Sequence, residues 1–304
     1  MSHTLLQMFL VMGLGLAWRL RAPGGLDATT ARRVLTAVVF NILLPALILD
    51  VLMRNTLGVD TVKIALSAAS GVLLSLAIAG WLGRRLHFPP ATLGTVLLAA
   101  AFPNATYLGL PLLERLFGPE GGGIAIQYDL FACTPLLLTV GILLASHYGS
   151  GAHWREVLRG LLRVPPLWAA LTAVALQVSG LTLPPLIHDT AHLLGQGVVP
   201  LMLLALGMSL RFETIPRRDL AALGLITAVQ LGLMPLMVWG TALIVDLPRP
   251  ILLPVVLEGA MPTMVLGVVL CDRYRLNTPL YAAAVTLTTA LALLTLPLWF
   301  AWAG

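Results

Sequence analysis

Charged residues are scarce in this sequence: they make up 10% of its 304 residues, whereas a soluble domain usually contains about 25%. Hydrophobic residues make up 59%, and the mean hydropathy is +0.94. This composition is typical of an integral membrane protein that spans the lipid bilayer. The apolar runs are long rather than alternating, which excludes a β-barrel, so we expect an all-α integral membrane protein.

Cysteine is equally scarce. Cys133 and Cys271 both lie in apolar stretches, so we expect small packing residues rather than a disulfide framework. The first residues lack the positive n-region and the small-residue cleavage site of a signal peptide. We therefore expect the first apolar segment to be a retained span.

Several catalytic and binding motifs are missing too. The apolar segments contain no Ser/His or paired-Asp arrangement, so we expect no enzyme, no catalytic residue and no resident cofactor. His188 and His192 have the spacing of a zinc helix, but the motif's glutamate is an aspartate here, and we expect no metal site. The formal net charge of +5 comes from basic residues spread through short loops, so we expect no nucleic-acid partner.

What the sequence does contain is a series of apolar segments separated by charged or Pro/Gly-rich breaks. Since a membrane helix needs roughly 20 apolar residues, these breaks predict ten spans. The predicted spans cover residues 4–18, 34–53, 62–82, 93–116, 122–147, 161–180, 186–210, 220–245, 251–271 and 279–303.

The basic residues divide unequally between the two sides that ten spans would create. The side that includes the N-terminus receives 4 of the 18 basic residues, and the opposite side receives 14. Because cytoplasmic loops carry the excess of Lys and Arg, we expect both termini outside a bacterial inner membrane. The four residues on the outer side are Arg54, Lys63, Arg115 and Arg249.

Prolines recur at similar places in the two halves of the chain. Pro45 and Pro200 are 155 residues apart, and Pro103 and Pro262 are 159 residues apart. The near-equal spacing predicts two five-helix repeats, over residues 1–160 and 161–304. Since five is odd, the second repeat must be inverted, and paired interrupted spans then indicate a transporter's binding site. The alternative is chance alignment, because prolines are common in membrane helices.

The segment "AFPNATYLG" around Pro103 and the segment "GAMPTMVLG" around Pro262 both weaken a helix in its middle. Unpaired backbone groups in lipid are costly, so such a break must line a cavity or be satisfied by protein. We expect the half-helices after both prolines to offer free N–H groups, around residues 104–107 and 263–265, to an anion.

These segments resemble the auxin efflux carrier family, which is related to the bile acid symporters. The stretch "PNATYLGLPLLERLFG" resembles the family signature P-N-T-x-x-x-G-x-P-L-L, with Ala105 inserted before Thr106. "FNILLPALIL", "VPLMLLALGMSL" and the segment from "AMPTMVLG" to "LTLPLW" resemble the second, seventh, ninth and tenth spans. The resemblance covers nearly the whole chain, although the long cytoplasmic loop of many plant members is absent.

The resemblance implies broken, crossing helices in spans 4 and 9. It also implies a scaffold of spans 1, 2, 6 and 7 and a transport bundle of spans 3–5 and 8–10. Family members export small carboxylates, such as auxin or malonate-like acids, and often form homodimers through the scaffold. The resemblance places Asn104 at the substrate-contacting asparagine. Sodium coupling, which is typical of the bile acid relatives, does not carry over.

No Lys or Arg lies in the core of a span, so an anion must be held by helix ends and neutral groups. Asn104 could instead cap the half-helix that follows it, and Tyr107 could serve aromatic packing. The predicted substrate-binding residues are Pro103, Asn104, Thr106, Tyr107, Gln127, Pro262 and Thr263. Asn41, Pro45 and Pro200 are predicted to line the seam between scaffold and bundle.

Two carboxylates lie within predicted spans, and such residues are functional candidates because isolated charges are costly in a membrane. Asp129 and Glu258 are therefore candidates for proton coupling, or else structural carboxylates that hydroxyls or N–H groups satisfy. We expect a secondary transporter that exports or exchanges a small organic anion by an alternating-access, elevator-like movement. The alternatives are a symporter coupled to H⁺ or Na⁺ and a passive channel for another small solute.

Overall fold

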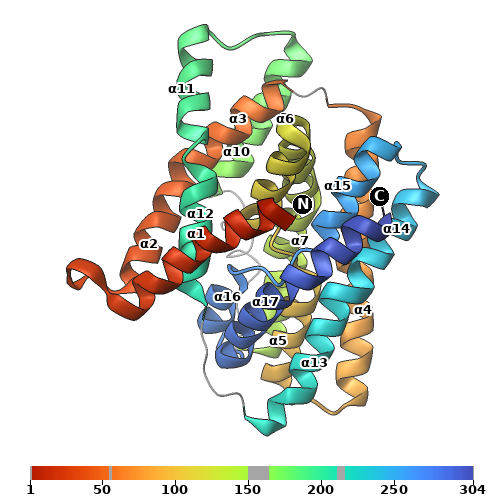
Figure 1. The fold of residues 1–304 in the computed structure, drawn as a ribbon. Coiled ribbons are helices and arrows are strands. Elements are labelled where there is room, and N and C mark those ends of the chain that lie inside the picture. The colour runs from red at the N-terminus through yellow and green to blue at the C-terminus, as the bar shows by residue number, and fades with distance from the viewer. Residues whose placement is uncertain (1, 55–56, 150–163, 211–215, 304) are drawn as a thin grey trace. The chain divides into compact units, whose positions relative to one another are not determined.

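The computed structural model describes residues 2–54, 57–149, 164–210 and 216–303. Within these ranges every regular element is a helix, apart from one isolated antiparallel bridge between Pro103 and Thr263 (Figure 1). The all-helical class is thus confirmed. The predicted boundary between the two repeats, at residues 160 and 161, lies outside the described residues.

The described residues before that boundary form seven α-helices of seven residues or more, joined by turns and short 3₁₀ or π segments. In chain order the elements are α1 (Ser2–Arg21), η1 (Pro23–Gly25), α2 (Ala28–Val38), η2 (Val39–Leu43), α3 (Leu44–Arg54), α4 (Val59–Arg85), α5 (Pro90–Ala101), η3 (Ala105–Gly109), α6 (Leu110–Tyr128), η4 (Asp129–Cys133), α7 (Thr134–Leu136), η5 (Leu137–Gly141) and α8 (Ile142–Tyr148).

The described residues after the boundary also form α-helices that are joined by turns and short 3₁₀ or π segments. Its described elements are α10 (Pro165–Ser179), α11 (Pro185–Gly195), α12 (Val198–Ser209), η6 (Arg217–Asp219), α13 (Leu220–Ala228), η7 (Val229–Leu233), α14 (Met234–Ile244), α15 (Arg249–Gly259), α16 (Gly267–Arg273) and α17 (Thr278–Ala303).

Seven helical stretches among the described residues are long and apolar enough to cross a membrane, whereas ten spans were expected from the sequence. The difference concerns the predicted fourth, sixth and ninth spans, and it has a structural reason at each of them. The fourth span is interrupted after the 12 residues of α5, and its remainder joins the fifth in one kinked stretch, Ala105–Tyr148. The ninth is divided into α15 and α16. The sixth begins outside the described residues, and α10 has only 15 residues. The ten-span inverted repeat stays a prediction.

Four of the described π-helical segments have a common local cause. Each of η2, η3, η4 and η7 ends two residues before a proline, namely Pro45, Pro111, Pro135 and Pro235. Proline has no N–H group and its ring clashes with the carbonyl group four residues earlier. A π-turn widens the helix at that carbonyl, so these helices continue past their prolines instead of breaking.

The helix α2 begins with a side-chain cap. The Asp27 carboxylate accepts hydrogen bonds from the N–H groups of Thr29 and Thr30, at 2.8 and 3.0 Å, and from the Thr30 hydroxyl, at 2.6 Å. The hydrogen bonds from Thr30 and Thr29 lower the pKa of Asp27. Such a cap satisfies N–H groups that have no partner within the helix, so the sequence "DATT" fixes where α2 starts.

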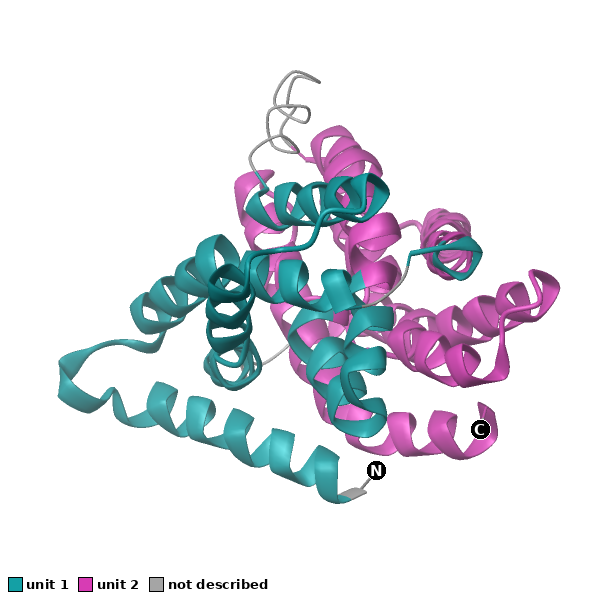
Figure 2. Cartoon of the chain, turned by 90° about the horizontal axis from the view of Figure 1, so that it is seen from above, with its two compact units in different colours: residues 1–61, 106–126, 163–210 teal, residues 62–105, 127–162, 211–304 magenta. Residues whose placement is uncertain are grey.

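The chain divides into two compact units, which Figure 2 shows in different colours. Unit 1 comprises residues 1–61, 106–126 and 163–210, and unit 2 comprises residues 62–105, 127–162 and 211–304. In unit 1, α1 packs along α12, and α3 packs against α10 and α11. In unit 2, α5 packs against α8, α13 and α17, and every residue of α5 from Thr92 to Ala101 is buried. The interruption that follows α5 therefore lies in the interior of unit 2.

Glycines allow α1 and α12 to pack backbone against backbone. A β-carbon added at Gly207 would collide with the Met12 carbonyl oxygen, and one added at Gly15 would collide with the Leu204 carbonyl oxygen. Small residues at a membrane helix interface permit this close approach.

We expect Gly207→Ala to separate these helices and to lower the stability of unit 1 by about 1–3 kcal/mol, the usual range for overpacking. The apparent melting temperature of the detergent-solubilised protein would measure the loss. Gly13→Ala is the matched control, because a β-carbon at Gly13 of α1 meets nothing within 4 Å. Equal melting temperatures for the two variants would contradict the proposed backbone contact.

Candidate functional site

The two helix interruptions in unit 2 pair with each other. The Asn104 N–H group donates to the Pro262 carbonyl at 2.7 Å, and the Met264 N–H group donates to the Phe102 carbonyl at 3.0 Å. These bonds form the antiparallel bridge between Pro103 and Thr263. The breaks predicted from the two prolines are therefore present, and they meet at one point in the interior of unit 2.

Side chains from neighbouring helices hold this pairing. The Thr263 hydroxyl donates to the Ala99 carbonyl at 2.8 Å, and the Thr263 N–H group donates to the Thr288 hydroxyl at 3.1 Å. Tyr281 donates to the Met264 carbonyl at 3.0 Å, and the Gln230 amide donates to the Met261 carbonyl at 2.9 Å. Backbone groups freed by the breaks are thus satisfied by protein, as burial requires.

This pairing corrects one expectation. The N–H groups of Asn104, Thr263 and Met264 were expected to be free for an anion, but each donates to a protein oxygen. Because the two breaks lie side by side, each offers the other the partners that its own helix lacks. Those three backbone donors cannot bind a substrate without giving up an existing hydrogen bond.

The side chain of Asn104 is different. Asn104 is 2% exposed, and its Nδ2 donor has no hydrogen-bond partner among the described residues. Buried polar groups are nearly always paired, so an unpaired donor of this kind needs an explanation. The Asn104 side-chain amide is therefore available to an acceptor atom of a ligand. It belongs to a residue whose backbone N–H group takes part in the pairing of the two breaks.

The other predicted substrate residues have varied surroundings. Pro103 and Pro262 lie within the breaks, and both donors of Thr263 are used to hold them. Gln127 is buried near the end of α6. Thr106 is half-buried and Tyr107 is buried in η3, and both belong to unit 1.

Both candidate carboxylates lie in unit 2. Asp129 begins η4 and accepts a hydrogen bond from the Thr134 hydroxyl at 3.0 Å. Glu258 is fully buried in the last turn of α15, and neither of its carboxylate oxygens has a partner among the described residues. Tyr128, which precedes Asp129 in the chain, has a buried hydroxyl that also lacks a partner among the described residues.

Sequence analysis missed three residues of this region: Gln230, Tyr281 and Thr288. They come from η7 and α17, where no motif marks them. The sequence marks one of them: Gln230 is an isolated amide in the apolar run "ITAVQLGLMPL". An intramembrane polar residue is a functional or structural candidate by default.

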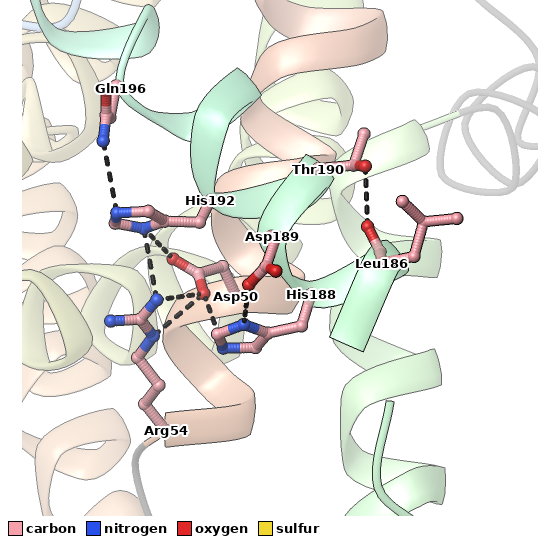
Figure 3. A network of polar contacts seen from close by, with 8 residues as sticks. All are labelled: Asp50, Arg54, Leu186, His188, Asp189, Thr190, His192 and Gln196. Carbon is pink, nitrogen blue, oxygen red and sulfur yellow. Dashed lines mark hydrogen bonds and ion pairs between the residues drawn. The ribbon is translucent and has the colours of Figure 1, made fainter. Parts of the chain in front are cut away.

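A second polar cluster lies in unit 1, around the buried carboxylate of Asp50 on α3 (Figure 3). Arg54 approaches its Oδ1 atom at 2.8 Å, and His188 Nε2 lies 3.3 Å from the same atom. His192 Nδ1 lies 3.0 Å from Oδ2. The two histidines of "HDTAH" thus serve as partners of a buried carboxylate and hold α11 to α3.

We expect Asp50→Asn to destabilise unit 1, because hydrogen bonds to charged groups contribute about 1.5–3 kcal/mol and the cationic Arg54 would lose its counter-charge. A fall in apparent melting temperature would measure this. Asp189→Asn is the control, since the Asp189 side chain is 79% exposed and its carboxylate lies 3.3 Å from the ring of His188 rather than on Asp50. A melting temperature of Asp50→Asn no lower than that of the control would contradict the assignment.

The predicted seam residues also lie in unit 1. Asn41 is exposed in η2 and donates its side-chain amide to the Ala37 carbonyl at 2.8 Å. Pro45 is half-buried on α3. Pro200 is exposed and lines a cavity of about 450 Å³, which Asp50, Glu114 and other unit 1 residues also line. The role of these three residues at a seam stays a prediction.

Comparison with known proteins gives the family. A family model described as "Membrane transport protein" matches residues 1–300. The chain belongs to this family, the auxin efflux carrier family. An uncharacterized transporter of Methanothermobacter thermautotrophicus is 32% identical over 302 residues, which are 98% of this chain and 97% of that protein.

Two relatives of lower identity match part of the chain. The uncharacterized transporter MJ1031 of Methanocaldococcus jannaschii is 27% identical over 68% of the chain and 67% of its own length. The uncharacterized transporter YfdV of Escherichia coli is 24% identical over 66% of the chain and 65% of its own length. The protein is thus a multi-pass member of a membrane transporter family, and the resemblance noted from its motifs is confirmed.

Proposed function

We propose that this family member is a secondary transporter that exports or exchanges a small organic anion, such as an auxin-like or malonate-like carboxylate, by alternating access. The substrate site is the region of the paired breaks in unit 2. The observation that carries this proposal is the buried side-chain donor of Asn104, which has no partner in the described part of the chain and lies beside two interrupted helices. A carboxylate supplies the acceptor that this donor lacks.

The composition of the two units supports a moving-bundle mechanism. Unit 1 includes the expected scaffold spans 1, 2, 6 and 7 together with residues 106–126, which the resemblance places in the bundle. Unit 2 includes the third, eighth, ninth and tenth spans and most of the rest of the bundle. In this proposal unit 2 carries the substrate site, and the scaffold forms a homodimer. The termini lie outside a bacterial inner membrane, and the arginine-rich side faces the cytoplasm.

A ligand screen tests the proposal. The purified protein is heated with a panel of mono- and dicarboxylates, since a ligand that binds only the folded state raises its apparent melting temperature. We expect one or more carboxylates to raise it for the wild type and not for Asn104→Ala. The best ligand is then tested in proteoliposomes, where saturable flux supports a carrier. Non-saturating flux with large electrical conductance would instead indicate a passive channel.

A further inference from the structure

Unit 2 contains a groove that the proposed transport mechanism does not use. Its volume is about 630 Å³, and it lies between α4, α5 and the η5–α8 segment. One end is apolar, with leucines such as Leu73, Leu76, Leu97 and Leu144 on its walls. Gly80 lies beside them and carries no side chain. The groove could therefore hold a hydrocarbon chain.

The other end of the groove is basic. Arg84 and Arg85 occupy the last turn of α4, and both are exposed. Arg84 donates to the Tyr148 hydroxyl at 3.1 Å, and the Arg85 guanidinium lies 5.5 Å from the centre of the Trp81 ring. His87 follows in the same lining. No acidic residue is among the described residues that line the groove, so this end attracts anions.

The turn after α4 fixes this basic end. The Phe88 N–H group donates to the Gly83 carbonyl, and the His87 N–H group donates to the Arg84 carbonyl, both at 3.1 Å. These two bonds close the helix in the pattern of a Schellman motif, with His87 in the left-handed region at a φ of 57°. The helix C-terminus also favours cations in its last turn, so the arginines are held at the mouth of the groove.

The combination of apolar walls and a basic end in one groove points to a membrane ligand rather than a soluble one. A free anion would occupy only the basic end and leave the apolar walls without a partner. Trp81 is exposed next to the arginines, and tryptophan is enriched at the boundary between lipid chains and headgroups. Arg84 and Arg85 belong to the arginine-rich side, and basic pockets between membrane helices on such a side bind anionic headgroups.

We propose that this groove is a specific binding site for an anionic phospholipid. One acyl chain lies along the leucine walls, and the phosphate group is held by Arg84 and Arg85, with His87 and the Tyr148 hydroxyl beside it. The lipid fastens α4 to α8 within unit 2.

The chain offers a matched control for a test of this site. Arg217 and Arg218, in η6, are a second exposed arginine pair in unit 2 on the same predicted side of the membrane, and they do not line the groove. Arg84→Gln/Arg85→Gln and Arg217→Gln/Arg218→Gln therefore remove equal charge from the protein. Only the first double variant changes the groove.

Native mass spectrometry of the full chain, with equal amounts of dioleoyl-phosphatidylglycerol and dioleoyl-phosphatidylcholine in the detergent, measures lipid retention. We expect the wild type and Arg217→Gln/Arg218→Gln to retain phosphatidylglycerol about tenfold over phosphatidylcholine. Arg84→Gln/Arg85→Gln should lose that preference. No preference in the wild type, or equal loss in both double variants, would overturn the proposal.

A second measurement keeps the test decisive if Arg84→Gln/Arg85→Gln does not fold. Brominated phosphatidylglycerol quenches tryptophan fluorescence on contact, so it should quench the wild type more than brominated phosphatidylcholine does. This excess should disappear in Trp81→Phe and persist in Trp168→Phe, which removes an exposed tryptophan of unit 1. An excess of quenching by phosphatidylglycerol that survives Trp81→Phe would place the lipid elsewhere and overturn the proposal.

Discussion

Asn104→Ala is expected to abolish most transport while leaving the fold intact. A hydrogen bond to a charged group contributes about 1.5–3 kcal/mol, which corresponds to a roughly 10- to 150-fold loss of substrate affinity. The Nδ2 donor has no partner among the described residues, so its removal takes away an unsatisfied buried donor rather than a stabilising contact. The backbone bond from Asn104 to Pro262 does not depend on the side chain and remains. Initial uptake rates in proteoliposomes would measure the loss.

The melting temperature separates this result from simple damage. Without ligand, Asn104→Ala should melt at the wild-type temperature or above it, and the stabilisation by carboxylate should disappear. Thr263→Val is the contrasting variant, because it removes a hydroxyl that donates to the Ala99 carbonyl and leaves that buried carbonyl without this donor. It should lower the melting temperature even without ligand. Undiminished uptake by a folded Asn104→Ala variant would remove the basis of the proposed site.

Local chemistry explains how much of this site the sequence could predict. Pro103 and Pro262, each with a glycine nearby at residue 109 or 259, weaken a buried helix, and on this ground the breaks were predicted. The same residue types do not always break a helix, because the helices at Pro45, Pro135 and Pro235 continue through π-turns. The signature around Asn104 was sufficient to indicate the family. The satisfaction of the broken backbone was not predictable, because Thr288 and Tyr281 come from a different helix and lie in an apolar run without a motif.

The cluster around Asp50 illustrates the same limit. Its partner His192 lies 142 residues further along the chain, and no local pattern connects the two. The i,i+4 spacing of His188 and His192 is visible in the sequence, but it is equally consistent with a metal ligand pair, a solvated helix face or, as the structure has it, two partners for a carboxylate on another helix. Only the packing of α11 against α3 distinguishes these possibilities.

Glu258→Gln is expected to make transport insensitive to a pH gradient. An ionised carboxylate that is buried without a partner costs several kcal/mol, so a cation must accompany it or a proton must neutralise it during the transport cycle. If that cation is a proton, glutamine mimics the neutral carboxyl group permanently. Uptake should then continue at a rate that no longer depends on the pH difference across the proteoliposome membrane.

Asp129→Asn should have a smaller effect of the same kind, because the Thr134 hydroxyl already stabilises the Asp129 carboxylate. Glu258 has no such partner within the described ranges. Glu120→Gln is the control, since Glu120 is exposed in the kinked region of α6.

The uptake measurement is repeated in sodium-free buffer. A response that follows the sodium gradient and disappears in Glu258→Gln would assign the carboxylate to Na⁺ instead. An unchanged pH response in both Glu258→Gln and Asp129→Asn would exclude both carboxylates from proton coupling. The Glu258 carboxyl group would then have a structural role in unit 2.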